Sequence, residues 1–164
     1  MIREMYHTQE KWSDVLTSPI ICKRAETWLG EGYYFWEDMD DAHQWGKSSK
    51  TRRGKYEIYI ATVDFNNVLD TVFNREQYYF WKAQIDKVAT MLGKKNKVRP
   101  TKNELNSYLK EKCQWNEVDG ILFQDIPISD SSLVKDLYYR KRIQLVAFNL
   151  KIITNFALRC TENC

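Results

Sequence analysis

Residues 30–46, GEGYYFWEDMDDAHQWG, carry aromatic rings at a spacing that could bind a ligand. Tyr34 lies in a run typical of a strand, and Trp45 follows eleven positions later on a predicted helix. If that helix folds back on the strand, the two rings face each other and form a slot. Because aromatic faces attract cations by about 0.5–2 kcal/mol, the slot suits a flat, positively charged ring such as the nicotinamide of NAD⁺.

Two glycines precede the aromatic run. Since glycine has no side chain, Gly30 and Gly32 would let the backbone approach a ligand closely, and Gly32 is a candidate binding residue. The run at 33–36 is also compatible with an ordinary core strand. If no other motif accompanied the run at 33–36, the core strand would be the simpler interpretation.

Motifs of several large enzyme classes are absent from the sequence. It contains no GxxxxGK[ST] phosphate loop, no GxGxxG motif and no HExxH, CxxC or GxSxG motif. Only two histidines occur, His7 and His43, so we predict no metal site. The four cysteines are predicted to be free thiols, because the charged start MIREMYHTQEKW has no apolar segment of an export signal.

The elements that position these residues are predicted from periodicity and capping signals. Helices are predicted at 9–17, from residue 37 through Trp45, at 74–92 and at 101–113, where Thr101 and Glu104 form a capping box. Strands are predicted at 19–23, 33–36, 55–65, 118–125 and 142–149, and 151–158 is either a further strand or a short helix. Because helices and strands are mixed without regular β-α-β alternation, we predict an α+β fold.

Length and composition bound the class of protein. A chain of 164 residues with 43% apolar and 14% aromatic residues predicts one domain with a core of ordinary size. A net charge of +3 permits an anionic partner without requiring one. No stretch approaches 18 consecutive apolar residues, so we predict no membrane span and expect a cytoplasmic protein.

Several short motifs, taken in order, carry a family resemblance. MYHT at 5–8, GEGYYFW at 30–36 and the pair Ala42 and Trp45 resemble the signature of ADP-ribosyltransferases of the diphtheria-toxin and poly(ADP-ribose) polymerase type. That signature is His-Gly-[Ser/Thr], Gly-x-Gly-x-Tyr-Phe, an aromatic residue eleven positions later and a glutamate on a late strand. YIATVDFNNVLD, VDGI and QLVAFNLKI resemble later strands of the family, with Gln144 in place of the glutamate. The resemblance spans most of the chain and implies a split β-sheet core with flanking helices.

The resemblance implies a role for each matching residue. His7 would hydrogen-bond the ribose hydroxyls on the adenosine side of NAD⁺. The backbone of Thr8, where the family usually has glycine, would hold the nicotinamide amide. Tyr34 and Trp45 would sandwich the nicotinamide ring, and Gln144 would face the ribose whose bond to nicotinamide breaks. The residues expected to take part in catalysis are therefore His7, Tyr34 and Gln144.

The reaction expected of such a site is cleavage of the bond between C1′ of ribose and nicotinamide. Its transition state is oxocarbenium-like, and a carboxylate beside the ribose stabilises that charge. A glutamine supplies a hydrogen bond but no negative charge, so the resemblance implies mono-ADP-ribosylation of a macromolecule without chain elongation. Glu37, Glu117 or Asp125 could supply a compensating charge, and the sequence does not choose among them.

Three basic stretches, at 47–55, 93–100 and 138–142, are usually solvated loops. They could also form a rim that binds the acceptor, either a nucleic acid or an acidic protein. Two alternatives to a transferase stay open: a non-catalytic module that binds NAD⁺ or ADP-ribose, favoured by Gln144, and a basic nucleic-acid-binding domain without a cofactor. Compact family members that act as toxins or in phage conflict are similar to this chain, which implies such a role and an antitoxin as partner.

Overall fold

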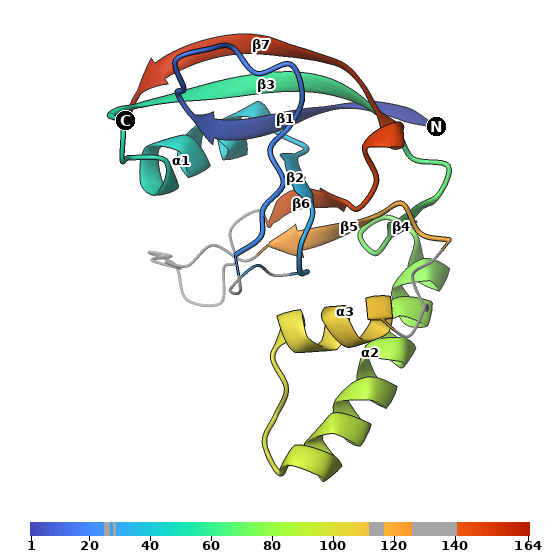
Figure 1. Cartoon of the computed structure of the whole chain (residues 1–164). Coiled ribbons are helices and arrows are strands. Elements are labelled where there is room, and N and C mark those ends of the chain that lie inside the picture. The colour runs from blue at the N-terminus through green and yellow to red at the C-terminus, as the bar shows by residue number, and fades with distance from the viewer. Residues whose placement is uncertain (25–26, 28, 112–116, 126–140) are drawn as a thin grey trace, which may run out of the picture.

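The fold is α+β, and its strands form one mixed sheet (Figure 1). The computed structural model describes residues 1–24, 27, 29–111, 117–125 and 141–164. In that part of the chain, seven strands are arranged in the order β4-β5-β6-β2-β1-β3-β7, with three α-helices and one short 3₁₀ helix. The pair β4 and β5 is parallel, and the other neighbouring strands are antiparallel.

The elements follow one another along the chain with strands at both ends. The strands are β1 (Ile2–Glu10), β2 (Tyr33–Trp36), β3 (Lys55–Asp64), β4 (Val68–Asp70), β5 (Gly120–Asp125), β6 (Arg142–Ala147) and β7 (Ile153–Asn163). The helices are α1 (Met39–Ser49), α2 (Arg75–Asn96), α3 (Lys102–Glu111) and the 3₁₀ helix η1 (Leu150–Ile152).

The sheet is nearly divided in two between β1 and β2. These strands share a single residue pair, Tyr6 with Trp36, whereas β1 pairs with β3 along its whole length. Figure 1 shows β1, β3 and β7 as one layer and β2, β6 and β5 as another. One hydrophobic cluster joins the two layers: Met5 and Val63 from the first contact Phe35 and Leu145 from the second. We call the place where β1 and β2 part the seam.

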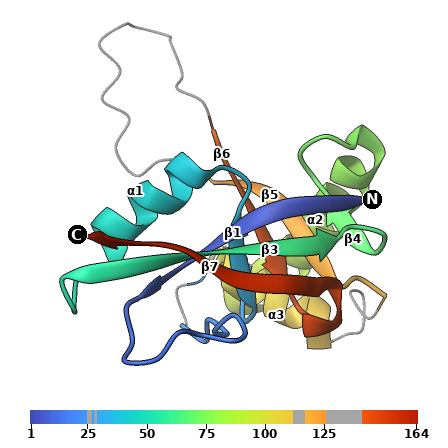
Figure 2. The same ribbon diagram turned by 90° about the horizontal axis from the view of Figure 1, so that it is seen from above.

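The other face of the sheet is covered by helices. Helix α1 packs on the part around the seam, where its Trp45 joins Trp36 and Tyr56 in a cluster. Helices α2 and α3 pack on the part formed by β5 and β6, through a cluster that includes Val88 and Val146. Figure 2 shows α1 lying apart from the pair α2 and α3.

Several predicted elements are confirmed. Strand β2 has the predicted bounds, and α1 begins directly after Asp38, whose side chain accepts a hydrogen bond from the Asp40 amide. The capping box of α3 forms as expected, because Thr101 N–H donates to Glu104 Oε2 at 2.7 Å and Glu104 N–H donates to Thr101 Oγ1 at 3.2 Å. Residues 153–163 form a strand, which settles the alternative left open at the C-terminal end.

The predicted helix at 9–17 is wrong. Strand β1 runs to Glu10, and the chain then crosses the sheet in an irregular segment. That segment is tied down by side chains of β3: Lys11 forms an ion pair with Glu57 at 2.9 Å, and the Leu16 amide donates to the Tyr59 hydroxyl at 3.1 Å. These long-range contacts replace the local hydrogen bonds of a helix.

The predicted strand at 19–23 is reduced to one isolated bridge between Cys22 and Gly32. The predictions also missed β1, which begins at Ile2, and β4. Cys22, Cys160 and Cys164 are free thiols as predicted, while Cys113 lies outside the described residues. In the part of the chain that the structure describes, no helix is long and apolar enough to cross a membrane.

Candidate functional site

His7 bridges the seam from β1 to β2. Its Nδ1 lies 2.9 Å from the carbonyl oxygen of Tyr34, and the backbone N–H of Ile20 donates to its Nε2 at 3.4 Å. Because a carbonyl can only accept and an amide can only donate, Nδ1 carries the proton and Nε2 presents a lone pair. The ring is therefore neutral, and its tautomer is fixed by the backbone on both sides.

Burial keeps His7 in this neutral form. The residue is only 4% exposed, and its ring lies 5.4 Å from that of Phe35. Burial lowers the pKa of His7 from 6.5 to about 4, and the positive charge of Lys50 adds to the effect in spite of the hydrogen bond to Tyr34. At neutral pH Nε2 therefore keeps its lone pair, which accepts the long hydrogen bond from the Ile20 amide.

Thr8 fixes helix α1 against the seam. Its hydroxyl is buried and donates to the carbonyl oxygen of Ala42 at 3.0 Å. That contact holds the middle of α1 over β1, three residues before Trp45. The Thr8 side chain therefore has a structural role, and its backbone lies at the edge of the seam where the resemblance predicts a contact with the nicotinamide amide.

Tyr34 is held by both ends of its side chain. Its hydroxyl donates to the Gly30 carbonyl oxygen at 2.7 Å and accepts from the Leu29 amide at 3.2 Å. Burial raises the pKa of this hydroxyl to about 12, so it stays protonated at physiological pH. The ring packs against the cluster that includes Val146. Tyr34 therefore sits rigidly beside the seam.

Trp45 contacts Trp36 rather than Tyr34. The rings of Trp36 and Trp45 have centroids 5.8 Å apart and planes inclined by 51°. The structure describes both Tyr34 and Trp45, and their rings are not in contact. Tyr34 and Trp36 share one face of β2, since they are two residues apart on a strand. A ligand ring stacked between Tyr34 and Trp45 would need the planes of the two side chains about 7 Å apart. This is twice the stacking distance of about 3.5 Å between two aromatic planes.

Gln144 reaches the same face from β6. It pairs across the strands with Trp36 on one side and Phe123 on the other, and it is only 7% exposed. Its side-chain amide hydrogen-bonds to none of the residues that the structure describes. The amide has no competing hydrogen bond among these residues, so it can bind a ligand.

Arg142 was singled out only as the last residue of the basic stretch 138–142, but it lies two residues before Gln144 on the same face of β6. Its guanidinium lies 5.0 Å from the centre of the Trp36 ring and forms an ion pair with Asp125 at 2.5 Å. The Nε of Arg142 is buried without a hydrogen-bond partner. A cation next to a strand glutamine was the only signal in the sequence, and such residues are common on surfaces.

Of the three acids that could compensate for Gln144, the structure brings only Asp125 near it. Asp125 lies opposite Arg142 on β5, diagonal to Gln144. Glu37 forms an ion pair with Arg3 at 3.2 Å and follows Trp36, so it lies on the other face of the sheet. Glu117 precedes the opposite end of β5. The charge of Asp125 is balanced by Arg142, so the surroundings of Gln144 are close to neutral.

The two glycines have structural roles that the sequence did not distinguish. A Cβ on Gly32 would lie 2.4 Å from Val146 Cγ2 and 2.9 Å from the Ala147 carbonyl oxygen, so this glycine lets β6 approach. Gly30 has φ +86°, a conformation that other residues rarely adopt. The expectation that Gly32 makes room for a ligand thus has a competing explanation, which is close packing of strands.

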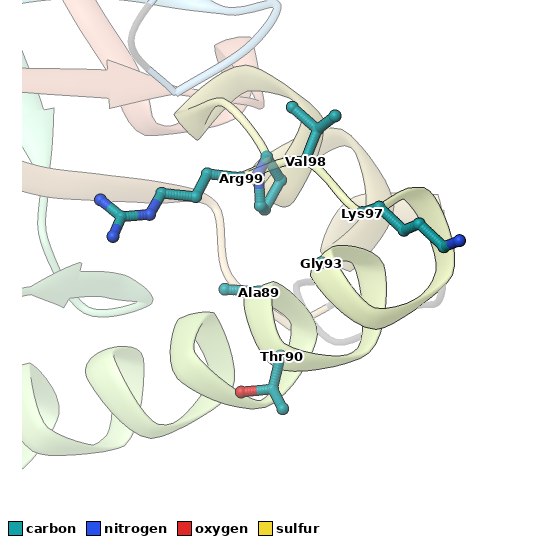
Figure 3. Close-up of a pocket in the computed structure, with 7 residues that line it drawn as sticks. Ala89, Thr90, Gly93, Lys97, Val98 and Arg99 are labelled. Atoms are coloured by element: carbon teal, nitrogen blue, oxygen red, sulfur yellow. The ribbon is translucent and has the colours of Figure 1, made fainter.

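A pocket lies far from these residues, at the C-terminal end of α2 (Figure 3). Its lining comprises Ala89, Thr90, Gly93, Lys97, Val98, Arg99 and Pro100. None of these residues belongs to the seam. Among the described residues, no group of three or more His, Cys, Asp or Glu side chains is placed to hold a metal ion.

No protein-family model matches this chain, and neither a curated protein nor a solved structure is similar to it at a significant level. The arrangement at the seam must therefore be interpreted from its own residues. It combines a hydrogen-bond acceptor on His7, aromatic rings on β2 and α1, and the amide of Gln144.

Proposed function

We propose that this protein is a mono-ADP-ribosyltransferase that uses NAD⁺ as a substrate and releases nicotinamide. One observation carries the proposal: His7 spans the seam to the carbonyl oxygen of Tyr34, and two residues further along β2 Trp36 lies against Trp45 of α1 and pairs with Gln144 of β6. The family resemblance assigns His7, Tyr34, Trp45 and Gln144 to NAD⁺, and each comes from a different part of the chain.

The chemistry of His7 suits a ribose hydroxyl. The hydrogen bond from Ile20 to Nε2 is long, at 3.4 Å, so it contributes little and a ligand can replace it. A hydroxyl of the adenosine-side ribose would donate to the Nε2 lone pair, while Nδ1 keeps its bond to Tyr34. Because the pKa of His7 is about 4, this acceptor persists across the physiological pH range.

The fold supports an ADP-ribosyltransferase-like split sheet. A single pair, Tyr6 with Trp36, connects the two halves, and the strands part on the side of His7 and Tyr34. Strands that part leave backbone groups of the two inner edges without ladder partners, and a ligand amide can satisfy such groups. The backbone of Thr8 would take this role for the nicotinamide amide.

Gln144 would act on the ribose that loses nicotinamide. Its amide oxygen would accept a hydrogen bond from a ribose hydroxyl, which orients the sugar as positive charge develops at C1′. An acceptor nucleophile then bonds to C1′ and loses its proton to solvent, while nicotinamide leaves with the electron pair of the broken bond. Asp125 is paired with Arg142 at 2.5 Å, so among Glu37, Glu117 and Asp125 no unpaired carboxylate lies near Gln144, and we expect slow transfer.

The near-neutral surroundings of Gln144 favour one second candidate, a module that binds NAD⁺ or ADP-ribose without turnover. Such a module needs the contacts of His7 and the aromatic rings but no charge at the ribose. The two candidates therefore share a binding site and differ only in whether the glycosidic bond breaks.

The test is incubation of the protein with NAD⁺ labelled in the adenylate group, together with cell lysate, followed by protease or nuclease digestion. A transferase places label on protein or nucleic acid and releases nicotinamide in equal amount. Binding of NAD⁺ without release of nicotinamide supports the module. Absence of NAD⁺ binding would rule out both candidates.

A further inference from the structure

Helix α2 begins with large aromatic side chains that face solvent. Phe73 is 60% exposed, Tyr79 54% and Phe80 48%. Two of them lie against cations: Arg3 is 5.3 Å from the Phe73 ring centre, and Arg75 is 5.6 Å from that of Tyr79. Exposed aromatic residues of this size are unusual on a free surface and indicate contact with a partner.

The same helix and the three residues after it concentrate the positive charge of the protein. Residues 75–99 contain seven lysines and arginines and two acids, a net charge of +5. The whole chain has a net charge of +3, so the remainder carries −2. Lys87 and Lys94 form no ion pair with any residue that the structure describes. The segment is therefore a positively charged surface on a nearly neutral protein.

Phe80 and two lysines lie along one line on α2, and Tyr79 lies beside that line about a quarter-turn around the helix. Phe80, Lys87 and Lys94 are seven residues apart, and positions at this spacing drift only about 20° around a helix. The opposite face is anchored by Val88 and Ile85, which pack in the cluster formed with β5 and β6. A helix of 22 residues is about 33 Å long, and Figure 1 shows its far end extending away from the sheet.

We propose that this face of α2 binds single-stranded nucleic acid and that such a strand is the acceptor of ADP-ribose. Lysines spaced along a helix match a polyanionic backbone, and exposed rings such as Tyr79 and Phe80 stack on unpaired bases. An acidic peptide would satisfy the charges but offers no flat faces for the rings. A duplex hides the faces of its bases inside the stack. The acceptor role rests on the proposed function, whereas the binding does not.

The position of α2 suits an acceptor. Its buried side contacts the cluster that contains Val146 and Tyr34. Gln144 lies two residues before Val146 on the same face of β6. Helix α2 therefore packs on the sheet face that carries the proposed NAD⁺ site, and a single strand bound along its solvent side would extend past the helix to reach that site.

The binding is tested without NAD⁺, by fluorescence anisotropy with a labelled single-stranded oligonucleotide of about 12 nucleotides, within the ~4–16 nucleotide range of such sites. The double variant Lys87→Glu/Lys94→Glu changes two exposed positions of α2. We expect this variant to weaken binding at least about tenfold near 50 mM salt. The slope of log affinity against log salt concentration should become shallower by about 1.4, which is about 0.7 for each of the two lost phosphate contacts.

The matched control is Lys47→Glu/Arg52→Glu, which makes the same change in net charge at exposed positions near the end of α1. It should weaken binding less than about threefold. The variant Tyr79→Ala should lose about 1–3 kcal/mol of binding, in line with one stacked base. No binding by the unmodified protein, or equal losses in the two double variants, would overturn the assignment of this surface.

The acceptor role is tested with NAD⁺ labelled in the adenylate group and the same oligonucleotide. With the unmodified protein we expect label on the oligonucleotide. With Lys87→Glu/Lys94→Glu we expect no such label, although calorimetry should show the same NAD⁺ affinity as for the unmodified protein. Nicotinamide release with label only on protein would contradict a nucleic-acid acceptor and leave the transferase standing. An intact oligonucleotide affinity with no NAD⁺ binding would contradict the transferase and leave the surface standing.

Discussion

The Nδ1 of His7 donates to the carbonyl oxygen of Tyr34 across 2.9 Å, at the point where strands β1 and β2 separate. This bond takes the place of backbone pairing between the two strands. It also fixes the proton on Nδ1, which leaves Nε2 as an acceptor at the edge of the seam. One side chain thus holds the two halves of the sheet together and prepares the proposed contact with ribose.

The burial of His7 predicts that stability depends on pH. The folded pKa is about 4 and the unfolded value is 6.5, so the unfolded state binds the proton first as pH falls. Stability is therefore fully present above pH 6.5 and decreases toward pH 4, by on the order of 3 kcal/mol. Urea unfolding across this range measures the loss.

The variant His7→Asn is the comparison for that measurement, because asparagine keeps an N–H near the position of Nδ1 and does not titrate. Between pH 6.5 and pH 4 the unmodified protein should lose about 3 kcal/mol of unfolding free energy that His7→Asn does not lose. Parallel curves for the two proteins would show that His7 is not buried in its neutral form.

Replacing Gln144 by glutamate is predicted to increase NAD⁺ hydrolysis. A carboxylate at this position would place negative charge beside C1′ as the oxocarbenium-like transition state forms, and groups of this kind contribute about 10²–10³ in rate. Chromatography of released nicotinamide measures the change. The control is Gln124→Glu, the same replacement at an exposed position of neighbouring strand β5. Equal rates in the two variants would remove Gln144 from the reacting ribose.

Tyr34 allows the ring and the hydroxyl to be separated. We expect Tyr34→Ala to weaken NAD⁺ binding by about 1–3 kcal/mol, because the stacking face is lost. Tyr34→Phe keeps the ring but leaves the Gly30 carbonyl and the Leu29 amide without this partner. It should lower the unfolding free energy by about 1–3 kcal/mol with little effect on NAD⁺ affinity. If both variants bind NAD⁺ equally, the ring does not contact nicotinamide.

Gly32 is predicted to be indispensable for packing. In Gly32→Ala the new methyl group would lie 2.4 Å from Val146 Cγ2, and we expect a loss of about 1–3 kcal/mol in unfolding free energy. Gly93→Ala in helix α2 is the control, because its nearest neighbour would be 3.9 Å away and alanine favours helix. Thermal unfolding compares them. A stable Gly32→Ala protein would restore the interpretation that this glycine serves only a ligand.

Local signals in the sequence predicted the three α-helices that form, although periodicity also predicted a helix at 9–17 that does not. The capping box of Thr101 and Glu104 and the side chain of Asp38 act within three residues, so their hydrogen bonds can be inferred without the fold. The run at 33–36 likewise has strong strand propensity. In these cases the residues that decide the structure are neighbours in the chain.

Strand β1 could not be predicted in the same way. Its inward positions include His7 and Thr8, whose polar side chains hide the alternation expected of a strand. Both are satisfied by groups about thirty residues away, the carbonyls of Tyr34 and Ala42. Contacts between residues about thirty positions apart form only in the assembled sheet, so the periodicity of the sequence cannot predict them.

In the candidate site too, local motifs predicted which residues to consider, but long-range contacts decide which side chains meet. Matching of short motifs selected His7, Tyr34, Trp45 and Gln144. In the structure the side chains of Tyr34 and Gln144 lie on the helix-covered face, whereas the ring of His7 packs against Phe35 on the opposite face. The motifs did not show that Trp45 meets Trp36, because residues two apart on a strand share a face and only the position of α1 decides between them. The guanidinium of Arg142 beside Trp36 was missed for the same reason.

The most direct measurement is titration of the protein with NAD⁺ by calorimetry, for the unmodified chain and for two tryptophan variants. We predict one NAD⁺ per chain and a loss of about 0.5–2 kcal/mol of binding in Trp45→Ala, because the ring beside the seam faces the cationic nicotinamide. Trp12→Ala removes a tryptophan that instead contacts Arg53, and it should bind as the unmodified protein does. Absence of NAD⁺ binding, or the same affinity in Trp45→Ala, would contradict an NAD⁺ site at the seam.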